Sequence, residues 1–266
     1  MRFILAVLAL VFSLGTAKAE FILVQSTTST ESSGLFGHIL PMFTAETGIE
    51  VRVVAVGTGQ AIKNAERGDG DVLLVHARAA EDRFVAEGFG VARHDVMYND
   101  FVIVGPQDDP ADVNGLSDPV VAFERVAAAA VPFVSRGDDS GTHKAELALW
   151  KEAAIDAAAA SGTWYREAGA GMGPTLNIAA SMNAYTITDR ATWAAFGNKG
   201  NLVIHVEGGE RLLNPYGVIL VNPDRHPNVK AELGQTFIDW LTGPRGQEAI
   251  ASFRIEGEQL FFPTAE

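Results

Sequence analysis

Short apolar runs alternate along this chain with segments whose apolar residues recur at helical spacing. The runs at 20–25, 50–56 and 71–77 are predicted strands, and each is followed by a polar loop and a helical pattern. Such continuous apolar strands, alternating with helices, are typical of a parallel sheet covered on both faces. The first third of the sequence therefore predicts an α/β unit, with residues 26–33 as a loop and Gly48 ending its first long helix.

A second alternating unit follows a segment, 108–119, that is rich in Asp, Pro and Gly. Two longer apolar runs, 97–106 and 214–223, match each other in length and character, and we interpret them as crossings between two lobes. The expected fold is therefore two α/β lobes joined by two crossing strands, with a ligand cleft between the lobes. The expected division is lobe I over 20–102, lobe II over 103–214, and a return segment of lobe I with C-terminal helices over 215–266.

The N-terminus has the pattern of a cleavable secretory signal over residues 1–19. Arg2 precedes a twelve-residue apolar run, and small residues flank Lys18, which predicts cleavage after Ala19. The alternative is a membrane anchor, but twelve helical residues reach only about 18 Å, too short for a bilayer. We expect a protein of the periplasm without membrane insertion of the mature chain.

Charge and cysteine content exclude several classes of protein. The chain has no cysteine, so disulfides, thiolate metal sites, cysteine nucleophiles and a lipid-modified N-terminal cysteine are excluded. Loss of Arg2 and Lys18 with the signal leaves 18 basic against 33 acidic residues, a net charge of −15. This charge argues against nucleic acid and anionic membranes as partners. It leaves a small anion possible, because distant surface charge is screened over about 10 Å.

Three loops share one design: each follows an apolar strand, carries hydroxyls and glycines, and opens a helix. They are 26–34 (STTSTESSG), 57–60 (GTGQ) and 135–143 (SRGDDSGTH). Helix N-termini present free N–H groups and a partial positive charge, and therefore bind anions. The alternative for each loop alone is ordinary helix capping by Ser or Thr.

Arg136, beside Ser140, Gly141 and Thr142, is the feature that capping does not explain. Its guanidinium is permanently charged, and its fork of donors matches a tetrahedral oxyanion. The alternative is a salt bridge within the loop to Asp138 or Asp139, and both interpretations can hold together.

Catalytic and metal-binding interpretations are weaker. GDDSG lacks the spacing of a nucleophile elbow, and GTGQAI has two of the three glycines of a dinucleotide fingerprint. The six histidines show no metal-ligand spacing, and the Asp108–Asp109 and Asp138–Asp139 pairs fit turns and caps. We expect no enzyme activity, no metal and no cofactor.

Taken together, the loops resemble those of the periplasmic tungstate-binding proteins of bacterial ABC importers (the TupA-type family). The matching blocks are STTSTESSGL, VVAVGTGQAI, GDVLLVHARAAEDRFVAEG, VMYNDFVIVGPQDDPA, SRGDDSGTHKAE, NAYTITDRATW and NPYGVILVNP, which follow the family order over nearly the whole mature chain. The resemblance implies a type II periplasmic binding-protein fold, with a tetrahedral oxyanion bound between the two lobes. It also implies delivery to a permease with a cytoplasmic ATPase, by a protein expected to be a monomer. The family's first block reads T-T-T-S, and Ser26 departs from it while keeping the hydroxyl.

On this interpretation lobe I offers Thr28 and Ser29 with their backbone N–H groups, and Thr58 adds a donor. The family's binding arginine corresponds to Arg136, and its loop completes the other side of the site. The full expected set is Thr28, Ser29, Thr58, Arg136, Ser140, Gly141 and Thr142. Weaker candidates are Ser26, Thr27, Gly57, Ser135 and Ser181.

Several alternatives stay open. Tungstate and molybdate are not separated by donor identities, and phosphate binders resemble the same R-x-D-x-S-G-T pattern. Phosphate near pH 7 still carries a proton, and a site for it needs an acceptor. Phosphate binders with this pattern have an Asp at the end of the strand that matches residues 71–76, where this chain has His76. The missing carboxylate favours a fully ionised dianion as the ligand. Sulfate delivery, a sensor role and an exported enzyme acting on phosphorylated or sulfated substrates are the remaining hypotheses.

Overall fold

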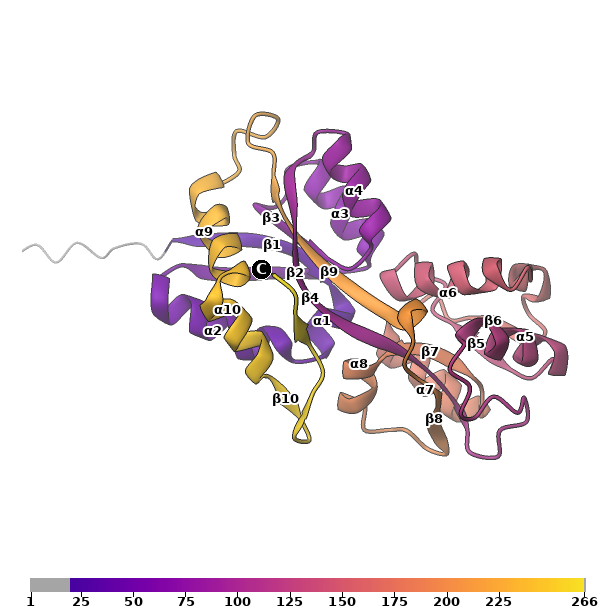
Figure 1. Ribbon diagram of the computed structural model, residues 1–266. Helices are drawn as coiled ribbons and strands as arrows, with labels where there is room; N and C mark the ends of the chain where they lie inside the picture. Colours follow the sequence, from indigo (N-terminus) through magenta and orange to yellow (C-terminus); the bar gives the residue numbers. More distant parts are fainter. Residues whose placement is uncertain (1–19, 266) are drawn as a thin grey trace, which may run out of the picture.

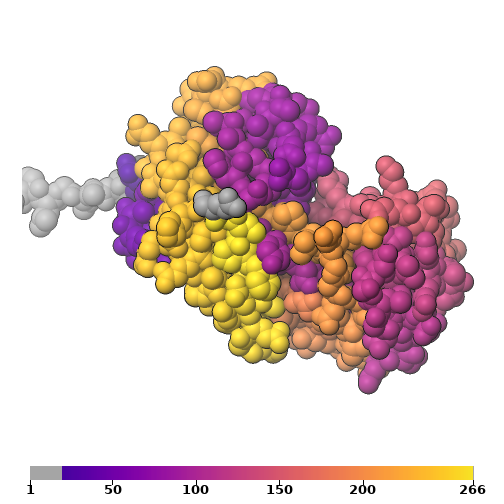
Figure 2. Space-filling model, viewed as in Figure 1, coloured from indigo at the N-terminus to yellow at the C-terminus, as the bar shows by residue number. Residues whose placement is uncertain are grey.

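The computed structural model describes residues 20–265, and the predicted signal segment 1–19 lies outside them. The chain forms two lobes (Figures 1 and 2), which long strands connect (Figure 1). The first lobe contains β1 (Phe21–Thr27), α1 (Thr28–Ser32), α2 (Leu35–Thr47), β2 (Glu50–Val56), α3 (Thr58–Glu66), β3 (Val72–Val75) and α4 (Arg78–Ala86). It also receives α9 (Ala231–Thr242), α10 (Pro244–Ser252), β10 (Arg254–Ile255), β11 (Glu258–Gln259) and β12 (Phe262–Pro263).

The second lobe is built from the middle of the chain. It contains α5 (Pro119–Ala129), β5 (Phe133–Ser135), α6 (Gly141–Glu152), η1 (Ala157–Ala160), β6 (Tyr165–Glu167), α7 (Met172–Met182), β7 (Thr186–Asp189), α8 (Arg190–Ala195), β8 (Leu202–Val206) and η2 (Glu210–Leu212). The strands β4 (Gly90–Pro106) and β9 (Leu213–Val221) run between the lobes (Figure 1).

The sheet of the first lobe has the order β12-β4-β9-β3-β1-β2. Strands β1, β2 and β3 are parallel, as predicted, but β9 pairs antiparallel with both β3 and β4. The expectation of a parallel sheet is therefore wrong for this part, because β9 enters the sheet on its return from the second lobe.

The long strand β4 belongs to both lobes. Its first part pairs with β9, and its last residues, Phe101–Pro106, pair with β7 and β8. The two predicted crossings are confirmed, although β4 begins seven residues earlier than expected, at Gly90. The predicted lobe boundaries at 102/103 and 214/215 fall within β4 and β9, and the division itself stays a prediction.

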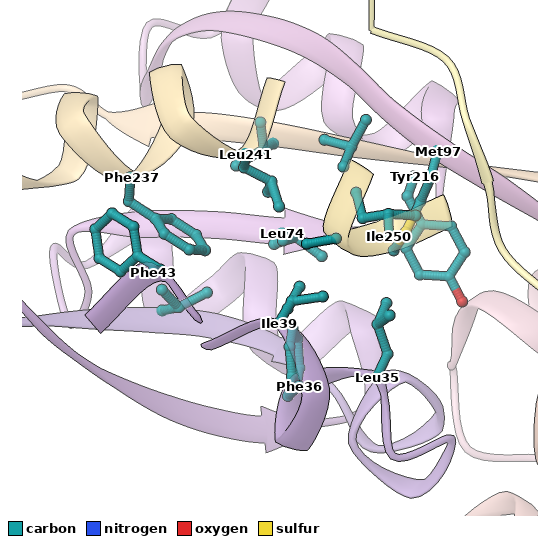
Figure 3. Packing of buried hydrophobic residues seen from close by; sticks show 14 of the residues in the cluster. Leu35, Phe36, Ile39, Phe43, Leu74, Met97, Tyr216, Phe237, Leu241 and Ile250 are labelled. Carbon is teal, nitrogen blue, oxygen red and sulfur yellow. The ribbon is translucent and has the colours of Figure 1, made fainter. Parts of the chain in front are cut away.

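Each lobe has apolar clusters on both faces of its sheet. In the first lobe α2, α9 and α10 pack Phe43, Phe237 and Leu241 over one face (Figure 3), while α3 and α4 cover the other with Ala61 and Phe84. The second lobe has two further clusters, around Phe123 and Trp150 and around Leu176 and Trp193. Burial of this apolar area stabilises each lobe by about 25 cal/mol per Å².

The polar segment after β1 differs from its prediction as a loop. The strand continues to Thr27, and a short helix, α1, follows at once. Thr27 is its N-cap: the Thr30 N–H donates to Thr27 Oγ1 over 3.3 Å, so the hydroxyl satisfies a free helix donor. The prediction that Gly48 ends α2 is confirmed, with a φ of 74° at that glycine. Within 20–265 we find no helix whose length and hydropathy suit a bilayer crossing.

Candidate functional site

A cradle of hydroxyl groups lies where β1 and β3 end side by side. Because these strands are parallel neighbours, the residues that follow them meet at one edge of the sheet. Thr27 Oγ1 and Ser29 Oγ lie 3.1 Å apart, and His76 Nε2 lies 3.2 Å and 3.1 Å from them, respectively. All three residues are at most 5% exposed. We call Thr27, Thr28, Ser29 and His76 the cradle.

His76 forms the floor of the cradle and is uncharged. Its Nδ1 lies 3.0 Å from Asn214 Oδ1, and its ring packs on Tyr216 with centroids 4.7 Å apart. Burial lowers the pKa of His76 to about 4, and the positive charge of Arg136 acts in the same direction, against the hydrogen bond to Asn214. A neutral ring at this position adds no charge to the first lobe's side of the cleft.

A chain of buried side chains connects the cradle to the second lobe. Asn214 Nδ2 donates to Asn99 Oδ1 over 2.7 Å, and Asn99 Nδ2 lies 3.5 Å from Asp189 Oδ1. Asn99 and Asn214 are paired neighbours on the crossing strands. Burial raises the pKa of Asp189, while the hydrogen bond from the Thr192 N–H and the charge of Arg136 oppose this shift. Asp189 Oδ2 has no hydrogen-bond partner among the described residues.

Arg136 is the central charged group on the second lobe's side, and its residue is 2% exposed. Nη2 pairs with Asp138 Oδ2 at 2.5 Å, and Nη1 lies 3.5 Å from Thr142 Oγ1. Nε is buried without a partner in the described part of the chain. The expected loop salt bridge is therefore present, and it leaves one edge of the guanidinium able to bind a further acceptor.

The two lobes contact each other beside this arginine. The Gly141 N–H donates to Thr58 Oγ1 over 2.8 Å, which joins the start of α6 to the start of α3. A Cβ added at Gly59 would meet the Asp139 carboxylate at 2.2 Å, and one at Gly57 would lie 3.5 Å from Asp138 O, so the start of α3 lies against the loop that opens α6. The structure therefore brings Thr58 and Gly141 together where the two lobes meet, and their role as oxyanion donors stays a prediction.

The N-terminus of α7 is a part of the site that the sequence analysis missed. Its N-cap, Gly171, provides no side-chain cap, and a Cβ there would lie 3.9 Å from Thr28 Oγ1. The first N–H groups of this eleven-residue helix thus face the cradle from the second lobe. The signal was the glycine-rich segment 169–173, which follows β6 and opens a helix as the other three loops do.

Ser181, by contrast, lies away from the cleft. It is an exposed residue in the last turn of α7, and its hydroxyl donates to Ile178 O over 2.8 Å. The prediction of Ser181 as an oxyanion donor is wrong, because the opposite end of this helix faces the first lobe.

Two of the other weak candidates, Ser26 and Ser135, are buried, but their hydroxyls are bonded elsewhere. Ser26 donates to Leu74 O, and Ser135 accepts from the Gly137 N–H. Gly57 is the N-cap of α3 and provides no side-chain cap. Ser140, one of the main candidates, caps α6 by accepting from the His143 N–H. These positions shape the loops, and Thr27 serves both as a cap and as part of the cradle.

The arrangement combines a buried positive charge with converging neutral donors. This is the chemistry that binds a small anion, and nearly complete burial means that an anion must enter through an opening of the lobes. Within residues 20–265 no group of three or more His, Asp or Glu side chains is placed to hold a metal ion.

The chain is similar over most of its length to known proteins. A model of the PBP superfamily domain matches residues 14–245. The tungstate-binding protein TupA of Peptoclostridium acidaminophilum is 48% identical over 248 residues, covering 92% of this chain and 86% of that protein. TupA of Desulfovibrio alaskensis has a TM-score of 0.79 at 46% identity, covering 93% of this chain and all of that one. A tungstate ABC transporter protein of Geobacter sulfurreducens has a TM-score of 0.80 at 50% identity, covering 88% and 99%.

Proposed function

Because this chain belongs to the PBP superfamily, and within it to the family of the tungstate-binding proteins TupA, we propose that it captures tungstate for an ABC importer. Its role is binding and delivery without catalysis. The relatives named as tungstate-binding proteins match it over most of their length. Capture takes place in the periplasm, and delivery is to a membrane permease with a cytoplasmic ATPase.

The buried guanidinium of Arg136 is the single observation that carries this proposal. Its Nη2 is paired with Asp138, but a buried donor without a partner is costly, and its Nε has no partner among the described residues. An oxyanion placed between Arg136 and the cradle would accept from Nε, from the hydroxyls of Thr28 and Ser29, and from the first N–H groups of α7. Each charge-assisted bond contributes roughly 1.5–3 kcal/mol.

Closure of the lobes is the step that creates the complete site. The hydroxyl donors belong to α1 in one lobe, and Arg136 belongs to the other, so the open form offers only half of the donors. An anion that contacts both halves stabilises the closed form by its differential affinity. The permease can then recognise a loaded protein by its closed shape.

One observation favours phosphate as a second candidate. Phosphate near neutral pH carries a hydrogen that needs an acceptor, and Asp189 Oδ2 is a buried carboxylate oxygen without a partner in the described chain. The charge of Arg136 influences the pKa of this carboxyl, so the two groups belong to one neighbourhood. Molybdate has the same shape and charge as tungstate, and the donor set suits both.

Calorimetric titration of the mature protein tests the proposal. The protein is first unfolded and refolded in a buffer free of oxyanions, and then titrated with tungstate, molybdate, sulfate and phosphate. We expect tight one-to-one binding of tungstate and no heat from phosphate or sulfate. Tight phosphate binding with no response to tungstate would replace the first candidate by the second.

A further inference from the structure

The ring of His76 lies between the two lobes, and this position suggests a second role. Gly141 opens α6 in the other lobe, and a Cβ at Gly141 would lie 2.6 Å from His76 Cε1 and 2.7 Å from Nδ1. The backbone of Gly141 therefore rests against the imidazole ring. Its own N–H is bonded to Thr58 Oγ1 of the first lobe, so this contact occurs where the two lobes meet.

The ring is supported on its other sides and cannot retreat. Asn214 holds Nδ1, Tyr216 packs on the ring, and Thr27 and Ser29 contact Nε2. The apolar cluster of the first lobe lies behind Tyr216, whose hydroxyl points away from the packed carbons (Figure 3). Protein interiors are closely packed and resist compression, so we expect the His76 ring to keep its position when α6 presses on it.

We propose that His76 acts as a stop: the start of α6 contacts its ring when the lobes close, and this contact limits how far they close. The stop thereby sets the size of oxyanion that the site accepts. The proposal rests on the proposed function, because it assigns a specificity-determining position within the same site. Arg136 lies five residues before Gly141 in the loop that opens α6, and Ser29 contacts the ring that α6 meets. The His76 ring, which separates Gly141 from the cradle, therefore fixes the distance between the donors of Arg136 and Ser29.

The physical consequence concerns anions of one shape but different radius. The metal–oxygen bonds of tungstate and molybdate are longer than the sulfur–oxygen bonds of sulfate. A site held open by an imidazole ring lets all donors reach the larger anion, whereas a smaller anion leaves some buried donors without partners, at a cost of about 1–3 kcal/mol each. Selection by size then needs no charge on His76.

Two substitutions with opposite expected effects test this proposal. His76→Asn shortens the stop, and we expect the preference for tungstate over sulfate, measured as a ratio of Kd values, to fall at least tenfold.

Gly141→Ala adds a methyl group against the ring and holds the lobes apart. We expect it to weaken binding of every tetrahedral anion at least tenfold, with sulfate affected most. The backbone of Gly141 is not in the left-handed region, so alanine is compatible with α6.

The controls separate this proposal from the proposed function and from misfolding. His38→Asn removes a histidine outside the cleft, where it bonds Ser252, and should leave all Kd values unchanged. Thermal unfolding of each variant establishes that it is folded, and small-angle X-ray scattering with tungstate reports closure. If folded His76→Asn keeps the wild-type ratio, or Gly141→Ala binds and closes as the wild type does, the stop is disproved while tungstate capture stands. Absence of tungstate binding by the wild type would instead reject the proposed function.

Discussion

The two walls of the cleft differ in how they offer hydrogen bonds. The first lobe presents the hydroxyls of the cradle and a neutral His76, anchored to both crossing strands through Asn214 and Asn99. The second presents a permanent charge, Arg136, in a loop where Gly137 and Asp139 both have positive φ. The first lobe supplies neutral hydrogen-bond donors, and the second supplies the positive charge. Because the donors are divided between the two lobes, we expect the affinity for a dianion to depend on closure.

Removing the charge should have the largest effect. Arg136→Ala deletes the buried cation but leaves the cradle intact. We expect tungstate affinity to fall at least about 100-fold, since the bond from Nε is lost and the Asp138 carboxylate is left without its cation. Calorimetric titration measures the change. Arg52→Ala is the control, because Arg52 is half-exposed and pairs with Glu50 on an outer strand. Wild-type affinity in Arg136→Ala would show that the charge of the second lobe is not the anchor.

One buried group in each lobe should make stability depend on pH, and the two dependences should have opposite signs. Burial lowers the pKa of His76 to about 4 and raises the pKa of Glu146, in the core of the second lobe, to about 7. As pH falls, His76 becomes protonated in the unfolded state before it does so in the folded state. Its contribution to the free energy of unfolding is therefore full above the ordinary histidine pKa of 6.5 and is lost as pH drops toward 4. Stability from protonated Glu146 is full below the ordinary glutamate pKa of 4.5 and is lost as pH rises through 7.

Glu146→Gln isolates the second of these responses. Tyr165 and Trp150 both donate to Glu146 Oε1, and an amide oxygen can accept both bonds. We expect a gain of up to about 3 kcal/mol in the free energy of unfolding near pH 8 and little change near pH 5. Denaturant unfolding at both pH values measures it. An equal gain at both would mean that ionisation of Glu146 is not its cause.

Removing one neutral donor should have the smallest effect. Ser29→Ala deletes one cradle hydroxyl, and we expect a loss of about tenfold in tungstate affinity, the value of roughly one hydrogen bond. Ser26→Ala is the matched control, because that hydroxyl is bonded to Leu74 O within the sheet. Competition binding at constant salt compares the two. If Ser26→Ala weakens binding as much as Ser29→Ala, the cradle is assigned to the wrong residues.

The sequence predicted those parts of the site that depend on local chemistry. An apolar strand followed by hydroxyls, glycines and a helix identifies a donor loop wherever it occurs, and so the loops at Ser29, Thr58 and Arg136 were found. The matching apolar runs also predicted the two crossings. These signals are local, and a single chain contains them in full.

The remaining features depend on relations that are not local. Asn99 and Asn214 form one chain only because β4 and β9 pair in this register, which spans 115 residues of sequence. The start of α7 was missed because β6 has three residues, two of them exposed, and lacks an apolar run. Ser181 was misplaced because the helix carries it about 14 Å beyond the N-terminus of α7, which faces the cleft.

An anomalous-scattering map at the tungsten edge, from crystals of the mature protein grown with tungstate, is the most direct test. We expect one strong peak between Arg136 Nε and Ser29 Oγ, with the first N–H groups of α7 within hydrogen-bond distance of its oxygens. A peak outside the cleft, or no peak at saturating tungstate, would contradict the account.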